Sequence, residues 1–368
     1  MDSQLPSPVR FSPLVERPDA DEGEVTRQLI ATMRYINERT FADSGHAIRS
    51  VHAKTHGILV GELEVYSGLQ RELAQGMFAA PKSFPVVMRF STIPGDILDD
   101  SVSTPRAVAI KVIGVEGERL EGSEGDNTQD FLLIDSPAFG APNPREFLKV
   151  VRLLSKTTNR VHWLKKILSA VMRRVQWVIV ATTGKRNATV STLGGHPETH
   201  ILGDTFYTQA ALRFGEFMAK LAVVPVSSEL TVLVQAPLNV NGIPNGLRQA
   251  VIDHFREKGG TWEVRAQLCT DLELMPIENA ATVWPEDESP YRPIAKIAVK
   301  PQVAWSNTRS SAVDDGMLFS AWHGLAAHRP LGGIMRVRKA AYEMGGRFRS
   351  ERNGRTIKEP REAVRFDD

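Results

Sequence analysis

The chain has 368 residues, with 45 Lys and Arg against 43 Asp and Glu and a formal net charge of +2. This near-neutral charge indicates no nucleic acid partner, and 42% hydrophobic residues with 28 Gly and 22 Pro exclude a collagen-like, coiled-coil or largely disordered chain. The single cysteine, Cys269, excludes an internal disulfide and any zinc or iron–sulfur site built from cysteines, as suits a reducing compartment.

Residues 1–24 are predicted to form an extended arm. Its prolines disfavour helix, and its acidic residues keep the segment solvated. It lacks the basic end and apolar run of an export signal, so we expect a cytoplasmic protein. A helix is expected next, because apolar residues recur at helical spacing from Leu29 to Ile36, ahead of Gly45.

Four strands are predicted to follow this helix. Each candidate is apolar or alternating, rich in branched residues, and bounded by Gly, Pro, Asp or Ser. The candidates span residues 57–66, 84–92, 106–114 and 129–135. Because no helical segment separates them, antiparallel pairing is favoured over parallel pairing with crossover helices.

The second half of the chain mixes helices and strands. Apolar spacing predicts one or two helices over residues 144–185 and another over 207–221. Further elements are predicted in chain order: a strand at 229–235, a helix at 247–257 behind an Asn245 cap, strands at 262–269 and 294–299, and a helix at 332–348. The polar tail at 351–368 is expected to pack little.

Polar residues interrupt the first predicted strands. His52 lies directly before the first strand, with Arg49 three residues earlier, and Asn127 stands at the entry of the fourth. Arg89 and Ser91 share one face of the second strand by its period-two alternation. If that face is turned into the barrel, the arginine needs a partner there, since an unpaired buried charge is very costly; otherwise it lies in water.

Arg338 and Tyr342 form a second candidate group, in the last predicted helix. They are four residues apart, so they neighbour each other on one helix face. A cation beside a phenol lowers the phenol pKa, and a phenolate oxygen is a suitable ligand for ferric iron. An exposed or capping pair is the alternative interpretation of the same spacing.

Taken in order, these segments resemble the motifs of the haem-dependent catalases. The family motifs R-x-x-H-A-K, R-F-S-T, N-T and R-x-x-x-Y are matched, respectively, by 49–54, 89–92, 127–128 and 338–342. Longer stretches at 202–227, 269–291 and 328–343 are similar to the small catalase-related proteins, relatives of coral allene oxide synthase. The resemblance covers roughly residues 25–350.

The resemblance implies an α+β fold, an eight-stranded antiparallel catalase-type β-barrel with inserted and C-terminal helices. The expected domains are the arm at 1–24, a haem-binding domain at 25–350 and the tail at 351–368. Haem b is the implied cofactor, with Tyr342 as axial iron ligand and Arg338 keeping the phenol ionised. The aromatic that stacks on the ring in large catalases has no clear equivalent: Phe131 is near in sequence, but the matching position is Leu132.

The resemblance also assigns roles around the ring. His52 would move a proton between the two peroxide oxygens, Asn127 would orient the peroxide, and Ser91 would fix the histidine ring. The haem-binding set would be completed by residues that line the ring or neutralise its propionates: Val51, Arg49, Arg89 and Arg349. The valine before the histidine matches catalases, whereas the coral isomerase has threonine there.

These assignments predict a haem peroxidase with some catalase activity, acting on hydrogen peroxide or organic hydroperoxides. One alternative is a fatty acid hydroperoxide isomerase or lyase, and another is a non-catalytic haem-binding protein. The basic, apolar stretch at 160–180 would line a lipid entrance or transiently touch a membrane surface; alternatively, it packs on the barrel as an ordinary helix. A homo-oligomer is expected.

Overall fold

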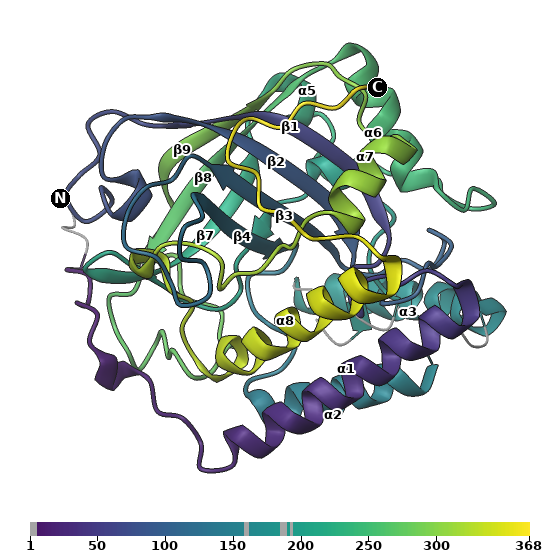
Figure 1. Cartoon of the computed structure of the whole chain (residues 1–368), viewed down its shortest axis with the longest axis horizontal. Helices are drawn as coiled ribbons and strands as arrows, with labels where there is room; N and C mark the ends of the chain where they lie inside the picture. Colours follow the sequence, from purple (N-terminus) through teal and green to yellow (C-terminus); the bar gives the residue numbers. More distant parts are fainter. Residues whose placement is uncertain (1–5, 158–161, 185–189, 192–193) are drawn as a thin grey trace.

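Eight strands close into an antiparallel barrel (Figure 1). The computed structural model describes residues 6–157, 162–184, 190–191 and 194–368. The strands are β1 Thr55–Val65, β2 Ser83–Thr92, β3 Arg106–Ile113, β4 Thr128–Ile134, β5 Phe206–Tyr207, β6 Leu212–Phe214, β7 Phe217–Pro225, β8 Gly260–Leu268 and β9 Arg292–Val299. The sheet runs from β5 through β4, β3, β2, β1, β9 and β8 to β7; β5 also pairs with β7, which closes the ring, and β6 is attached to β7. The predicted barrel is confirmed.

The side chains of β2 point alternately to the inside and to the outside of the barrel. Met88 and Phe90 belong to the central apolar core, whereas Val87 belongs to a second cluster on the other side of the wall. Since side chains alternate along a strand, Arg89 and Ser91 share that outer side with Val87. Both are nevertheless buried, because helices and the segment before the last helix cover this part of the barrel.

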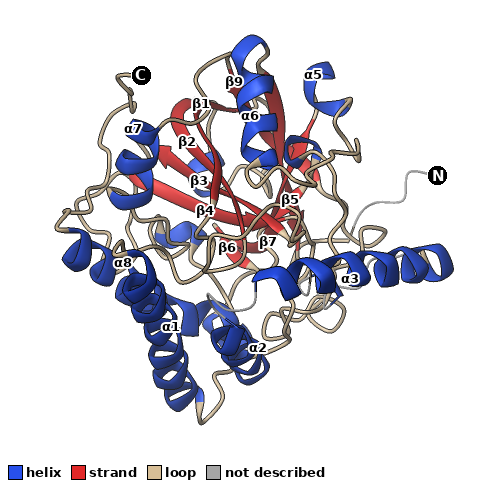
Figure 2. Cartoon of the chain, turned by 90° about the vertical axis from the view of Figure 1, so that its right-hand side faces the viewer, coloured by secondary structure: helices blue, strands red, loops and turns tan. Residues whose placement is uncertain are grey.

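Of the described helices, the four longest lie below the barrel in Figure 2, and the shorter ones lie around its upper part. They are α1 Glu22–Ser44, α2 Pro144–Thr157, α3 His162–Thr183, α5 Ser228–Thr231, α6 Gly246–Glu257, α7 Asn307–Ser310 and α8 Gly333–Asn353, with a π-helical turn at Ser311–Asp315 and 3-10 turns at Pro13–Val15, Gly76–Phe78, Ile201–Gly203 and Ala326–His328. α1 packs on both α2 and α8 through a shared apolar cluster. Among the described residues, no helix combines the length and apolar character needed to cross a bilayer.

The predicted helix over 207–221 is wrong, because these residues form β5, β6 and most of β7. β7 is buried along almost its whole length, so its apolar run does not alternate. Such a run cannot be distinguished from a buried helix by periodicity. Gly215, with φ +61°, lies in the two-residue turn between β6 and β7, where a positive φ suits glycine.

The predicted strand at 229–235 is also wrong. The chain there forms the short helix α5 and then turns. Val232 and Val234, which suggested a strand, are exposed on the surface. The other predicted strands and helices are confirmed, although residues 158–161 and 185 of the helical prediction at 144–185 lie outside the described residues. Asn245 occupies the N-cap of α6 but makes no side-chain capping bond.

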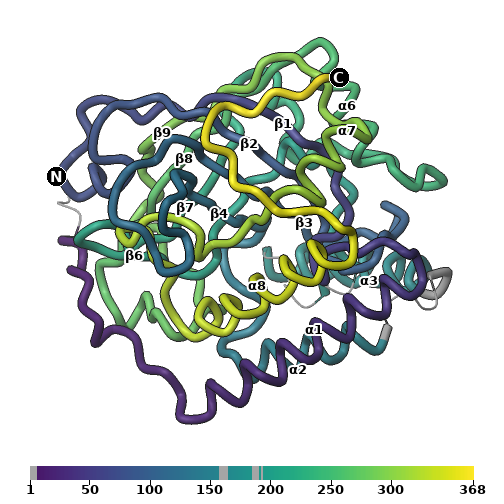
Figure 3. Tube along the Cα trace, in the orientation of Figure 1, coloured from purple at the N-terminus to yellow at the C-terminus, as the bar shows by residue number. Residues whose placement is uncertain are grey.

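Contrary to expectation, the polar tail packs against the barrel (Figure 3). Glu359 Oε2 lies 2.5 Å from the Nζ of Lys111, which is fully buried and also pairs with Asp130 at 2.7 Å. Asp368 pairs with Arg309 at 2.8 Å, and Phe366 adds apolar contact to the outer cluster. A buried ammonium group requires carboxylate partners, and the tail supplies one of them.

The described part of the N-terminal arm, from residue 6, also packs against the rest of the protein. Val9 and Phe11 pack on an apolar cluster that contains Trp284. Glu16 accepts a hydrogen bond from Arg336 at 2.8 Å. The arm holds only one 3-10 turn before α1, which agrees with the extended conformation predicted from its prolines.

Candidate functional site

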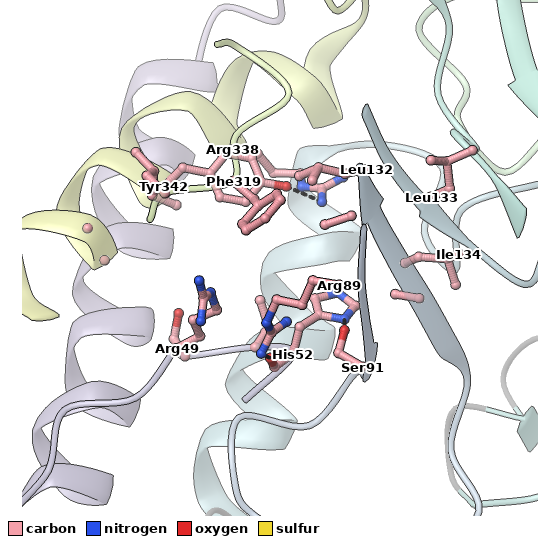
Figure 4. Close-up of a pocket in the computed structure, with 18 of the residues that line it drawn as sticks. Arg49, His52, Arg89, Ser91, Leu132, Leu133, Ile134, Phe319, Arg338 and Tyr342 are labelled. Atoms are coloured by element: carbon pink, nitrogen blue, oxygen red, sulfur yellow. Dashed lines mark hydrogen bonds between the residues drawn. The ribbon is translucent and has the colours of Figure 1, made fainter. Parts of the chain in front are cut away.

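A cavity lies between the outer face of the barrel and α8. The space between its walls is about 810 Å³ when the part open to solvent is included. Eight of the nine predicted site residues line it: Arg49, Val51, His52, Arg89, Ser91, Arg338, Tyr342 and Arg349. Figure 4 shows His52, Arg89 and Ser91 on one side of the cavity and Tyr342, Arg338 and Phe319 on the other. Segments from both ends of the chain therefore meet here.

His52 is held in an uncommon backbone conformation. Its φ is +56°, which is rare for a residue with a side chain and is often found at functional sites. Its N–H donates to the carbonyl of Ile93 at 2.7 Å, and its own carbonyl accepts from Arg89 Nη2 at 2.8 Å. Its Nδ1 lies 3.4 Å from Ser91 Oγ. The backbone bonds and the contact with Ser91 therefore orient the ring, and the role that the resemblance implies for Ser91 stays a prediction.

The surroundings of His52 keep its ring neutral. Burial, reinforced by the positive charges of Arg89 and Arg338, lowers the pKa of His52 to about 3. The negative charge of Asp135 opposes this shift but does not cancel it. A neutral imidazole has one nitrogen free to accept a proton, so His52 is ready to act as a base across the physiological range.

We expect activity that depends on His52 to show no inflection near pH 6.5. Because its pKa is lowered, the base form is already complete at pH 5 and is lost only as the pH falls toward 3. For a reaction in which His52 is the base, steady-state kcat/KM should therefore be flat from pH 5 to pH 8. A fall in kcat/KM below pH 6.5 that disappears in Ser91→Ala would contradict this environment for the ring.

Asp314, in the π-helical turn, is the main site residue that the sequence did not reveal. Its Oδ1 lies 2.9 Å from Arg49 Nη1 and 2.6 Å from Arg89 Nε, and its backbone carbonyl accepts from Arg349. Although burial acts in the opposite direction, the guanidinium groups of Arg89 and Arg49 hold the pKa of Asp314 well below its usual range. The acid is therefore ionised and central to the cluster.

The arginine cluster carries more positive charge than this carboxylate neutralises. Burial, together with repulsion from Arg349 and Arg89, lowers the pKa of Arg49 well below its usual value. Burial and the charge of Arg89 likewise lower the pKa of Arg349 to about 10. Arg49 and Arg89 bond the Asp314 carboxylate and Arg349 bonds its backbone carbonyl, with Asp315 as a second nearby acid, so an anionic ligand would further relieve the repulsion among the three guanidinium groups.

Tyr342 and Arg338 are neighbours on α8, as their spacing predicted. Arg338 Nη2 donates to the Tyr342 hydroxyl, and its guanidinium carbon lies 5.2 Å from the centre of the tyrosine ring. Burial nevertheless raises the pKa of Tyr342, and Arg338 offsets only part of the rise. Arg338 alone therefore does not bring the pKa of the phenol below its ordinary value, and its role beside an iron-bound phenolate stays a prediction.

The surface of α8 beside Tyr342 is flat. Gly345 and Gly346 follow the tyrosine by three and four residues, so they lie on the same helix face and line the cavity. A Cβ added to Gly345 would meet no heavy atom within 4 Å. Gly345 thus leaves open space beside Tyr342, whereas a Cβ at Gly346 would lie 3.2 Å from Leu318 Cδ1.

Asn127 is not brought to the cavity. It stands just before Thr128, at the end of β4 that pairs with Ile113. The cavity lies at the other end of β4, where Ile134 pairs with Ala107. Along an extended strand, Asn127 lies about 16 Å from Leu132, the nearest cavity residue of β4, and about 23 Å from Ile134. The Asn127 side chain instead donates to the carbonyl of Arg361 in the tail at 3.1 Å. The structure therefore contradicts its predicted place beside His52: the N-T match lies at the opposite end of the strand.

Other cavity residues had no strong signal in the sequence. Leu132 lines the cavity while Phe131 packs in the central core, in agreement with the position counted from the N-T motif. The aromatic ring that lines the cavity is Phe319, on the Tyr342 side. Gln209 also lines it, with φ +62° and a bond from its amide to the Ala138 carbonyl at 2.6 Å. These loop residues reach the cavity only through long-range packing.

Comparison with known proteins finds matches by fold but not by sequence. No family model and no curated protein match the sequence. Among solved structures, a fungal catalase and catalase A from Saccharomyces cerevisiae both align with TM-score 0.59, at 16% and 17% identity, and a bacterial catalase aligns with TM-score 0.55 at 13%. The fold is that of the catalases. These alignments cover 85% of this chain but 61%, 63% and 59% of those proteins, so the chain spans about three fifths of their length.

Proposed function

We propose that the protein is a haem-dependent peroxidase or catalase of the small catalase-related type, acting on hydrogen peroxide or an organic hydroperoxide. The observation that carries the proposal is the opposition of Tyr342 and His52 across one cavity of the catalase fold (Figure 4). The first offers an oxygen ligand and the second a neutral base. Tyr342 would hold the iron, and His52 would handle the proton that peroxide cleavage requires.

The cavity residues fit haem b. Tyr342 would bind the iron, and the glycine face of α8 leaves room for a flat ring. Arg49, Arg89 and Arg349 have excess positive charge, which suits the two propionates. The haem would supply the redox chemistry, and the protein would supply binding and proton transfer.

His52 would transfer the proton that peroxide cleavage requires. Ser91 occupies Nδ1, which leaves Nε2 as the nitrogen that exchanges a proton with a bound peroxide. The neutral ring would accept the proton from one peroxide oxygen and return it to the other, so that the leaving oxygen departs as water or an alcohol. Val51 beside it lines the cavity with an apolar side chain.

Substitution of Tyr342 by Phe tests the proposed ligand. Tyr342→Phe keeps the ring but removes the oxygen, so the haem-loaded protein should lose its tyrosinate-type ferric spectrum and peroxide turnover. Tyr35→Phe, on the exposed side of α1, is the control and should leave both unchanged. A Tyr342→Phe protein with the wild-type ferric spectrum would overturn the proposed ligand.

Substitution at Gly345 tests the flat binding face. Gly345→Leu fills open space, so we expect haem affinity to fall by about 10-fold or more, as overfilled sites lose roughly 1–3 kcal/mol. Gly345→Ala adds only a methyl group in that space and should stabilise the helix by about 0.5–1 kcal/mol with haem still bound. Titration with haem, followed by absorbance, measures both variants; equal affinity in the two would show that the ring lies elsewhere.

A fatty acid hydroperoxide isomerase or lyase is the second candidate. It is favoured by the apolar residues that line much of the cavity, among them Met33, Leu132, Ile134 and Leu318. Parallel product analysis with hydrogen peroxide and with a polyunsaturated hydroperoxide distinguishes the two candidates: oxygen or oxidised donor supports the first, and a rearranged lipid in the absence of a donor supports the second. The cytoplasmic location and homo-oligomeric state stay predictions.

A further inference from the structure

α3 presents its polar side to the protein. Ser169 and Gln176 are 0% and 3% exposed. Ser169 Oγ donates to the Gly194 carbonyl at 2.6 Å and accepts from the Ser103 N–H at 3.0 Å, while Gln176 donates to Ser191 Oγ at 3.1 Å. α3 therefore packs on the rest of the protein through hydrogen bonds rather than through an apolar stripe.

The opposite side of α3 is apolar and exposed. Its aliphatic residues recur at intervals of four, four and three, so they form one continuous face, called here the α3 stripe: Ile167, Val171, Val175 and Val178. Trp177, 73% exposed, stands at its edge. A helix on a water-exposed surface normally has the reverse orientation, with apolar residues inward. Figure 2 shows α3 at the margin of the molecule, reaching beyond the strands.

Positive charge surrounds the α3 stripe. Residues 160–186 include seven Lys and Arg and no Asp or Glu, in a chain whose total charge is only +2, so the remaining residues are acidic overall. Arg174 is exposed on the same helix face as the stripe. On the inner side, Lys165 and Arg173 pair with Asp96 and Glu198 at 2.6 and 3.2 Å. Lys166, which is 46% exposed, also pairs with Asp99 at 2.8 Å, so among the described residues the positive charge of the outer face comes from Arg174.

We propose that α3 binds the surface of an anionic lipid bilayer. An aliphatic stripe, a tryptophan at its edge, an exposed arginine and a surrounding segment rich in Lys and Arg are the features of a helix that lies in the plane of the interface. A second copy of the chain fits less well, because two-fold pairing of α3 would bring two Arg174 side chains together on helices that carry no acid. The proposal does not rest on haem chemistry.

Bilayer contact would also place the cavity near lipid. α3 covers residues 96–103, through the pairs from Lys165 to Asp96 and from Ser169 to Ser103. Gly95, which precedes this loop, approaches the backbone of Ser50 so closely that a Cβ would lie 2.0 Å from the Ser50 carbonyl oxygen. Ser50 lines the cavity. A single loop thus separates the proposed lipid-binding helix from the cavity wall.

Vesicle flotation tests the lipid surface. The full-length protein should float with vesicles of phosphatidylcholine and phosphatidylglycerol at 70:30 but not with phosphatidylcholine alone, and 0.5 M NaCl should release it. Val171→Asp with Val178→Asp should weaken binding by about 10-fold or more, and Arg174→Gln by about 5-fold. Val232→Asp with Val283→Asp, exposed valines outside α3, should bind like the wild type.

Two further measurements keep the proposal falsifiable. A vesicle-induced blue shift of tryptophan fluorescence should be lost in Trp177→Phe, and far-UV circular dichroism should show that every variant is folded. Failure of the wild type to float with anionic vesicles would overturn the proposal, as would equal flotation of the double α3 variant. Light scattering that shows an oligomer dissociated by the double variant, without vesicle binding, would assign the stripe to a second copy.

Discussion

Replacement of His52 by alanine is expected to lower kcat/KM for hydrogen peroxide by about 10²- to 10⁴-fold, the usual contribution of a positioned acid–base group. The substitution removes the neutral imidazole that Ser91 and the backbone bonds of His52 aim into the cavity. Haem affinity should change little, because the proposed ligand and the arginine cluster remain. Oxygen evolution and peroxide absorbance, normalised to haem content, measure the effect.

The matched control for this experiment is His254→Ala. His254 is half-buried in α6, bonded to the Gly259 carbonyl at 3.0 Å, and does not line the cavity. Its loss should leave kcat/KM unchanged. Full peroxide turnover by His52→Ala would remove the base from the mechanism and favour the non-catalytic haem-binding protein.

Substitution of Asp314 by Asn should destabilise the haem-free protein by about 3–5 kcal/mol, the usual cost of breaking a buried ion pair from one side. The carboxylate accepts from Arg49, Arg89 and, at 2.8 Å, Ser310 Oγ, so its charge is the one that the arginines share. Without it, three guanidinium groups repel one another in a buried site. Urea unfolding at pH 7 measures the loss.

The stabilisation from Asp314 should depend on pH with a defined sign. Its pKa is lowered in the folded protein, so the contribution is complete above the unfolded value of about 4 and is lost as the pH falls below it. The difference in unfolding free energy between wild type and Asp314→Asn should therefore shrink between pH 5 and pH 2. A constant difference across that range would show that the charge of Asp314 is not what stabilises the cluster.

If the haem propionates bind the same arginines, haem should reduce the loss of unfolding free energy caused by Asp314→Asn. The haem-loaded variant should then be closer in stability to its wild type than the haem-free variant is. Asp204→Asn is the control, because Asp204 pairs with buried Arg106 at 2.8 Å and neither residue lines the cavity. Rescue of both variants by haem would indicate general stabilisation rather than binding at Arg49, Arg89 and Arg349.

Local sequence patterns predicted which side chains are neighbours where the repeat of a single helix or strand sets their positions. Arg338 and Tyr342 are neighbours because the helix repeats every 3.6 residues, and Arg89 and Ser91 share a face because a strand repeats every two. The same patterns failed at 207–221, where a strand buried on both sides shows no alternation. They also could not tell which side of the barrel wall the Arg89 face would occupy.

The sequence by itself determined six of the nine described strands, the terminal helix and eight side chains that line one cavity. Only the tertiary structure decided the charge balance of that cavity, because Asp314 meets Arg49 and Arg89 from more than 220 residues away. Strand register likewise excluded Asn127, which lies at the wrong end of β4. Spacing along the chain fixes near neighbours, whereas long-range packing and register fix which distant groups share a site.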